Sequence, residues 1–323
     1  MSATPSIIER ICSSPRIPAP SHVVFKILEY TKDPECPARK VGDLIASDGG
    51  LTAELLRQAN SALYGFSTPT SSAQEACMRL GMTRVRSAVI NQHIVNGLGK
   101  AKPQGFDANR YWQATLATSV AAQDLCRRVL PNMAEDATTA GLLCDIGIGM
   151  MAFGIPAEYA PVLAAYSPPT VPLHRIERRM LQINHAEVAS AVLADWRLDA
   201  HILDAVKHHH YDMWELAPAK PEKFARVVAA AVTLSEIALN GSEMDQVAAL
   251  FAQIDALSSD ADALVGKLLD GLVARIQATA DAFAVELGSV ADMQSNFENV
   301  ARSALEIGVS ISSTPMDRSR FER

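Results

Sequence analysis

Apolar residues recur at helical spacing along most of the chain, and this spacing limits the fold more than any other feature. Val24, Ile27 and Leu28, for example, fall on one helical face. No stretch alternates between apolar and polar residues for more than a few positions, as half-buried strands do. The sequence therefore predicts an all-α fold. The main expected helices span residues 52–60, 73–80, 83–97, 108–129, 137–153, 156–166, 173–182, 185–196, 200–208, 222–240 and 264–284.

Composition favours a folded protein without a strong affinity for polyanions. The 323 residues are 49% hydrophobic and 20% charged, which is enough apolar material for a large core. The formal net charge is −7. Because nucleic-acid binders need clustered Lys and Arg, this charge argues against nucleic acid as the partner.

Cysteine usage and hydropathy favour a cytoplasmic protein. Five cysteines without a CxxC pair are typical of reduced thiols. The first twenty residues lack the apolar core of a signal peptide. We found no continuous apolar run of about 18 residues, so no membrane span is expected.

One segment combines small and apolar residues with a single acid, Asp145, which follows Cys144. The segment 141–152 resembles the central motif of the HD superfamily, helical phosphohydrolases in which adjacent His and Asp bind metal. Mixed nitrogen and oxygen ligands suit iron, manganese, zinc or magnesium. Here Cys144 replaces the histidine. The alternative, which the sequence alone favours, is a small buried Cys behind an Asp that caps a neighbouring helix.

Histidines near two other expected helices are further candidate ligands. His185 begins one helix, and the run His208, His209 and His210 ends another. Consecutive residues spread around a helix end, so at most two of the three can face one site. Each histidine also has a structural alternative, because His185 can bond a backbone group and a His near a helix C-terminus is favoured by the helix dipole.

Three arginines flank a glycine between two expected helices. Arg79, Arg84 and Arg86 surround Gly81 and form a candidate interaction surface. Two helices with a basic edge could serve as a helix-turn-helix. Such helix pairs are common, and the acidic net charge argues against DNA binding.

The order and spacing of these segments resemble the HDOD domain (HD-related output domain) of bacterial signalling proteins, from Ile17 to His210. The segments that carry the resemblance are Ile17–Pro20, Ile45–Gly65, Pro69–Ala76, Leu80–Arg86, Tyr111–Thr118, Ala140–Gly147, His185–Ala189 and Val206–His210. The resemblance implies an N-terminal helical bundle packed on an HD-like helical bundle. We therefore expect a leader at 1–16, an HDOD domain at 17–212 (parts 17–100 and 106–212), a C-terminal helical extension at 222–308 and a disordered tail at 309–323.

Departures from the HD pattern favour binding over catalysis. The resemblance places Ala114 and Cys144 where HD-like relatives carry histidines, while Asp145, His185, His209 and His210 remain. Losing two nitrogen ligands should remove most metal affinity. We therefore expect a non-catalytic signalling module without a cofactor. Its expected partners are other signalling proteins or a small ligand in the vestigial pocket.

Two alternatives stay open. The first is a residual metal-dependent phosphohydrolase in which Asp145, His185, His209 and His210 hold one ion that activates water. The second is nucleic-acid binding through Arg79, Arg84 and Arg86.

Overall fold

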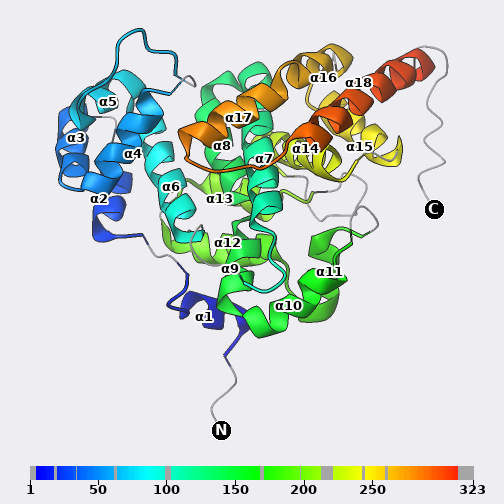
Figure 1. Ribbon diagram of the computed structural model, residues 1–323, viewed down its shortest axis with the longest axis horizontal. Coiled ribbons are helices and arrows are strands. Elements are labelled where there is room, and N and C mark those ends of the chain that lie inside the picture. Colours follow the sequence, from blue (N-terminus) through cyan, green and yellow to red (C-terminus); the bar gives the residue numbers. More distant parts are fainter. Residues whose placement is uncertain are drawn as a thin grey trace.

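The computed structural model describes residues 5–17, 20–33, 35–61, 64–98, 103–167, 171–196, 198–211, 221–241, 244–258 and 261–311. These residues form α-helices and short 3-10 helices, and none of them belongs to a strand. The all-α prediction is confirmed. Figure 1 shows a helical group from the first part of the chain on one side of the long helix α7 (Ala108–Val129) and most of the C-terminal helices on the other.

The N-terminal bundle contains α2 (His22–Tyr30), α3 (Ala38–Ala46), α4 (Gly49–Ala59), α5 (Ala73–Leu80) and α6 (Met82–Leu98). Ser21, Asp48 and Ser72 cap α2, α4 and α5 with their side-chain oxygens. The α4 helix begins three residues earlier than the sequence predicts, because the Asp48 side chain accepts bonds from the backbone amides of Gly50 and Leu51. Helix α6 packs against α8 and joins this bundle to the next.

The second bundle is built around α7 (Ala108–Val129), whose inner face is buried over most of its length. Around it lie η1 (Pro131–Met133), α8 (Ala134–Leu143), α9 (Ile146–Gly154), α10 (Pro156–Ala165), α11 (Leu173–Leu181), α12 (His185–Leu193), η2 (Ala194–Trp196) and α13 (Ala200–Lys207). The first helix, α1 (Ile7–Cys12), packs on α9 and α12. The helical part of the expected leader therefore packs with this bundle.

The expected single helix at 137–153 is wrong, because the structure breaks it at Cys144 and Asp145. Helix α8 ends at Leu143, and Asp145 has φ −91° and ψ 5°. Because of this turn α8 and α9 are two separate helices, and Asp145 lies at their junction. The predicted helix at 264–284 is also broken, at Gly271, whose φ of 64° favours glycine.

Residues 131–154 are apolar and long enough, by composition, to cross a membrane, which the sequence argument overlooked. However, 78% of the most apolar window is buried inside the protein. The stretch comprises η1, α8 and α9, which pack against α7 and α12. Its hydrophobicity is therefore that of a core segment.

The C-terminal helices are α14 (Lys223–Asn240), α15 (Met244–Asp255), α16 (Ala261–Leu269), α17 (Leu272–Ala282) and α18 (Ala291–Ile311). Both α14 and α17 pack directly on α7, so the extension shares the core of the second bundle. Helix α18 ends at Ile311, so the first three residues of the tail predicted at 309–323 are helical instead. Residues 312–323 lie outside the described residues, as do all but Pro221 of the residues between the predicted HDOD domain and the predicted extension.

Candidate metal centre

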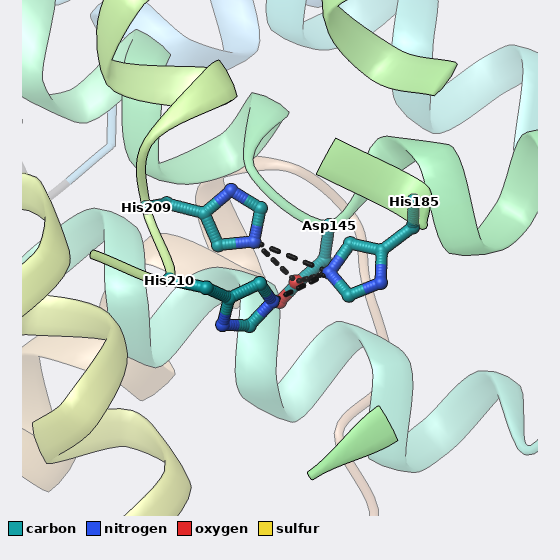
Figure 2. Close-up of side chains that lie close together, drawn as sticks. All are labelled: Asp145, His185, His209 and His210. Atoms are coloured by element: carbon teal, nitrogen blue, oxygen red, sulfur yellow. Dashed lines mark hydrogen bonds and ion pairs between the residues drawn. The ribbon is translucent and has the colours of Figure 1, made fainter. Parts of the chain in front are cut away.

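Four of the predicted site residues meet at one point, although they come from three places in the chain. Asp145 lies between α8 and α9, His185 is the first residue of α12, and His209 and His210 follow α13. Figure 2 shows the three imidazole rings turned toward one another and toward the Asp145 carboxylate. One ligand atom from each residue lies within 4.8 Å of the other three. We call these residues the four-residue cluster.

The cluster has the dimensions of a metal site. The Nε2 atom of His185 lies 2.8 Å from His210 Nε2 and 3.2 Å from His209 Nε2. Asp145 Oδ1 lies 3.5 Å from His185 Nε2 and 3.6 Å from His209 Nε2. The ligands of a tetrahedral ion, each about 2.1 Å from the metal, lie roughly 3.4 Å from one another. The observed separations bracket that spacing.

The second nitrogen of two rings is already engaged. His185 Nδ1 lies 2.7 Å from Glu177 Oε2, and His209 Nδ1 lies 2.6 Å from the Val206 carbonyl oxygen. Both partners accept hydrogen bonds, so each ring donates through Nδ1 and turns Nε2 toward the cluster. A carboxylate or carbonyl behind a ligating histidine is the usual arrangement in metal sites.

Local structure holds His185 in place. Asn184 caps α12 in a capping box with Glu187, which fixes where the helix begins. Gly147 of α9 lies against the His185 backbone, and a Cβ atom at this glycine would lie 2.0 Å from the His185 carbonyl oxygen. The close approach of α9 to α12 therefore requires glycine at this position.

Charge is distributed unevenly over the three rings. Burial alone would lower the pKa of His185, but Glu177 and Asp145 raise it to about 10. Burial and the neighbouring His185 lower the pKa of His209 to about 4, and burial and His209 hold that of His210 well below its usual value. In the metal-free protein, His185 therefore carries the proton at the centre of the cluster.

The donor set fits a metal ion. Three imidazole nitrogens and one carboxylate oxygen suit zinc, iron, manganese, nickel or copper better than calcium or magnesium, which prefer oxygen ligands. The pKa of the Asp145 carboxyl is lowered, against the effect of its burial, by the histidines beside it. Asp145 is therefore an anion, as a ligand must be.

The other two predicted pocket residues contribute no ligand atom to this cluster. Ala114 of α7 lines the space beside it. The Cys144 side chain is fully buried, and burial together with Asp145 holds the pKa of its thiol well above the usual value. His208 turns away and bonds Asp204 at 2.9 Å.

A cavity of about 140 Å³ opens beside the cluster. Its wall includes Asp145, His185 and His210 together with Arg110 of α7 and Glu236 of α14. Burial and the nearby Asp145 raise the pKa of Glu236 to about 7. The cavity therefore lies between the second bundle and the C-terminal extension.

Sequence reasoning missed Glu177, Arg110 and Glu236. Glu236 could have been noticed as the single acid in the apolar stretch 224–239 of its expected helix. Glu177 had no such signal, because it lies in the strongly charged segment 175–179 yet is completely buried.

The three predicted surface arginines are all engaged in ion pairs within the chain. Arg79 lies 2.7 Å from Glu75, and Arg84 lies 3.0 Å from Glu135. Arg86 pairs with Asp199, and its side chain is only 11% exposed. The geometry therefore gives these arginines a structural role, and nucleic-acid binding through them stays a prediction.

Comparisons with known proteins agree with this architecture. A protein of Treponema pallidum without an assigned function is 23% identical over 228 residues, which are 69% of this chain. The match spans only 42% of that protein's own length.

Three solved structures share the fold. An HDOD domain protein of unknown function from Geobacter sulfurreducens has a TM-score of 0.67 at 24% identity, covering 86% of this chain and 98% of its own. A proposed phosphohydrolase from Shewanella amazonensis also scores 0.67, at 23% identity and 85% and 97% coverage. A proposed signal transduction protein from Marinobacter aquaeolei scores 0.65, at 19% identity and 88% and 62% coverage.

The sequence pattern of the HDOD domain matches residues 17–211, more than half of the chain. Apart from α1, this range contains both helical bundles, and it includes all members of the four-residue cluster. The chain belongs to the HDOD domain family.

Proposed function

We propose that this chain is a non-catalytic module of signal transduction whose HD-like pocket holds one divalent metal ion and binds a ligand or a partner there. The family and the signal transduction protein of similar fold support the regulatory part of this proposal. The ion would be held by Asp145, His185, His209 and His210.

The convergence of three Nε2 atoms carries the proposal. Three lone-pair positions directed at one another repel unless a cation lies between them, and here a proton on His185 takes that place. A divalent ion offers a better match, because it binds all three nitrogens and the Asp145 carboxylate together.

The same geometry argues against phosphodiester hydrolysis with two metals. A second ion would lie about 3.5–4 Å from the first and would need further ligands of its own. Ala114 has no ligand atom, and the thiol of Cys144 is buried and protonated. A single ion with this donor set would supply charge and a coordination position for a ligand facing the cavity.

Hydrolysis by a single metal is the second candidate function. Two observations support it. The cavity is lined by both Arg110 and the cluster, and one protein of similar fold is a proposed phosphohydrolase. A metal-activated water and a substrate phosphate would both need room in that cavity.

An assay with metal-loaded protein separates the two. Tag-free protein is loaded with zinc, manganese or iron(II), its melting temperature is measured, and p-nitrophenyl phosphate and bis(p-nitrophenyl) phosphate are then offered. We expect the melting temperature to rise with metal, since ligands that bind only the folded state stabilise it, and no turnover. Turnover that Asp145→Asn abolishes would establish the hydrolase. An unchanged melting temperature would exclude metal binding.

A further inference from the structure

The cavity beside the four-residue cluster has the features of a small-molecule site. We propose that it binds a small organic carboxylate with an apolar body, whose head group lies between Arg110 and the cluster and whose body contacts the apolar wall. The head group has two contacts in this proposal, Arg110 and the metal ion. The contact with the metal ion rests on the proposed function.

The wall of the cavity is mostly apolar. Its volume of about 140 Å³ is below the range of about 300–1,000 Å³ that holds drug-sized ligands, so it suits a molecule with one ring or a short chain. The apolar lining comes from five regions and includes Phe106, Ile148, Leu163, Leu173, Val232 and Leu239. An apolar body would displace water from these side chains.

Polar groups interrupt the apolar lining. Arg110 donates a hydrogen bond to the Asn240 side chain, which fixes the guanidinium on the cavity wall. Thr118, which is 1% exposed, also lines the cavity, and its buried hydroxyl has no hydrogen-bond partner among the described residues. Buried hydroxyls nearly always have a partner. A bound oxygen atom would supply one here.

The guanidinium of Arg110 favours an anionic head group. Asp145 and Glu236 are the acids facing the interior of the cavity, while Asp107 lies exposed where its carboxylate caps α7. Guanidinium binds carboxylates with strong, directional hydrogen bonds. A carboxylate could therefore pair with Arg110 and take a coordination position of the ion.

The C-terminal extension forms one side of this site. Ser235, Glu236 and Asn240 of α14 line the cavity, although α14 lies beyond the residues that match the HDOD domain. The Ser235 hydroxyl donates to the Ala114 carbonyl oxygen at 3.0 Å and holds α14 against α7. A ligand in the cavity would therefore contact both parts and couple its binding to the position of α14.

Calorimetric titration of the zinc-loaded full chain with three probes tests the head and the body separately. The probes are 3-phenylpropionate, 3-phenylpropan-1-ol and acetate. We expect the first to bind at least about ten-fold more tightly than either of the others, since hydrogen bonds to charged groups are the strong ones. Arg110→Gln should remove most of the preference for the carboxylate over the alcohol.

A cavity-filling variant provides the second arm. Ala114→Leu places a larger side chain in the cavity and should weaken 3-phenylpropionate binding by about ten-fold or more, whereas Ala165→Leu, on the exposed face of α10, should leave it unchanged. Circular dichroism and zinc content verify that each variant is folded and loaded.

The outcomes separate this site from the metal proposal. If zinc binds but the carboxylate binds no better than the alcohol, or Ala114→Leu has no effect, the ligand site is overturned and the metal centre stands. If no zinc binds, the metal centre fails. The ligand site is then judged on the metal-free protein, where loss of the carboxylate preference in Arg110→Gln supports it and absence of any preference overturns it.

Discussion

Glu177 is joined to His185 by two hydrogen bonds at once. Its Oε2 atom accepts from the His185 backbone amide at 2.8 Å and lies 2.7 Å from the ring Nδ1. Its other oxygen accepts from the Tyr159 hydroxyl at 2.5 Å. Glu177 is completely buried. Its carboxylate binds the first backbone amide of α12 and also orients the imidazole ring that faces the cluster.

Glu177→Gln should therefore damage both stability and metal binding. The amide cannot accept at both positions or balance the charge of His185, and breaking a buried ion pair costs about 3–5 kcal/mol. Metal affinity should fall about 10- to 100-fold, as is typical when the partner of a ligating histidine is lost. Urea denaturation and metal titration measure the two effects.

Tyr159→Phe is the matched control for that variant. It removes a single neutral donor to the same carboxylate and should cost about 1.5–3 kcal/mol, the usual range for a hydrogen bond to a charged group, with metal affinity nearly unchanged. Equal effects of the two variants would contradict the role given to Glu177.

Gly147→Ala should displace His185 by forcing α9 and α12 apart. The added methyl group would overlap the His185 carbonyl, and overpacking of this kind costs about 1–3 kcal/mol. Gly49→Ala is the control, because a Cβ atom at Gly49 meets nothing within 4 Å. Thermal melts of the metal-free and metal-loaded proteins should show a loss for Gly147→Ala alone. A Gly147→Ala protein with wild-type stability would exclude this close contact.

Stability of the metal-free protein should be greatest near pH 6.5, the usual histidine value. The pKa of His185 is raised to about 10 in the folded state, so its contribution is complete below pH 6.5 and is lost as pH rises toward 10. The pKa of His209 is lowered to about 4, and that of His174, whose ring stacks on His210, to about 3. As pH decreases from 6.5 the unfolded chain therefore takes up protons first, and stability falls on this side as well.

Chemical denaturation across pH 4–10 in the presence of a chelator measures this profile. His185→Gln should lose the decline on the alkaline side. If wild-type stability kept rising between pH 7 and 9 and the variant behaved in the same way, His185 would not carry the proton.

Cys144→Ala should leave metal stoichiometry unchanged, because the thiol is fully buried and is not among the four converging ligands. The small cavity should cost about 1 kcal/mol. Metal analysis of the variant after loading provides the measurement. Loss of the ion would show that Cys144 is a ligand and would require a different arrangement of α8.

Arg86→Ala should destabilise the junction between α6 and the start of α13. Arg86 is nearly buried, while its partner Asp199 is 30% exposed, so solvent weakens the pair and we expect a loss of about 1–2 kcal/mol. Arg178→Ala, which breaks the more exposed pair with Glu187, should cost less than about 1 kcal/mol. Equal losses in urea denaturation would argue against a structural role for Arg86.

Sequence periodicity predicted most of the helices, because their apolar faces lie on one core. It failed at Cys144 and Asp145, because the end of α8 and all of α9 consist of small and apolar residues and the periodicity gives no sign of the break. The turn depends on tertiary contacts, including the approach of Gly147 to His185.

The candidate site was predicted in part. The resemblance to HD proteins selected Asp145, His185, His209 and His210, and the structure brings these four together. Because Ala114 and Cys144 replace two histidine ligands, the sequence predicted little metal affinity. This low affinity remains a prediction. Sequence could not show that the remaining nitrogens face one point, because this depends on the hydrogen bonds of Glu177 and Val206.

The most direct test is native mass spectrometry of the tag-free protein after loading with zinc, manganese or iron(II), alongside His209→Ala and His208→Ala. His208 adjoins the cluster in sequence but bonds Asp204 outside it. The account predicts one ion per chain in the wild type and in His208→Ala, and none in His209→Ala. A wild-type protein without metal, or equal loading of both variants, would contradict it.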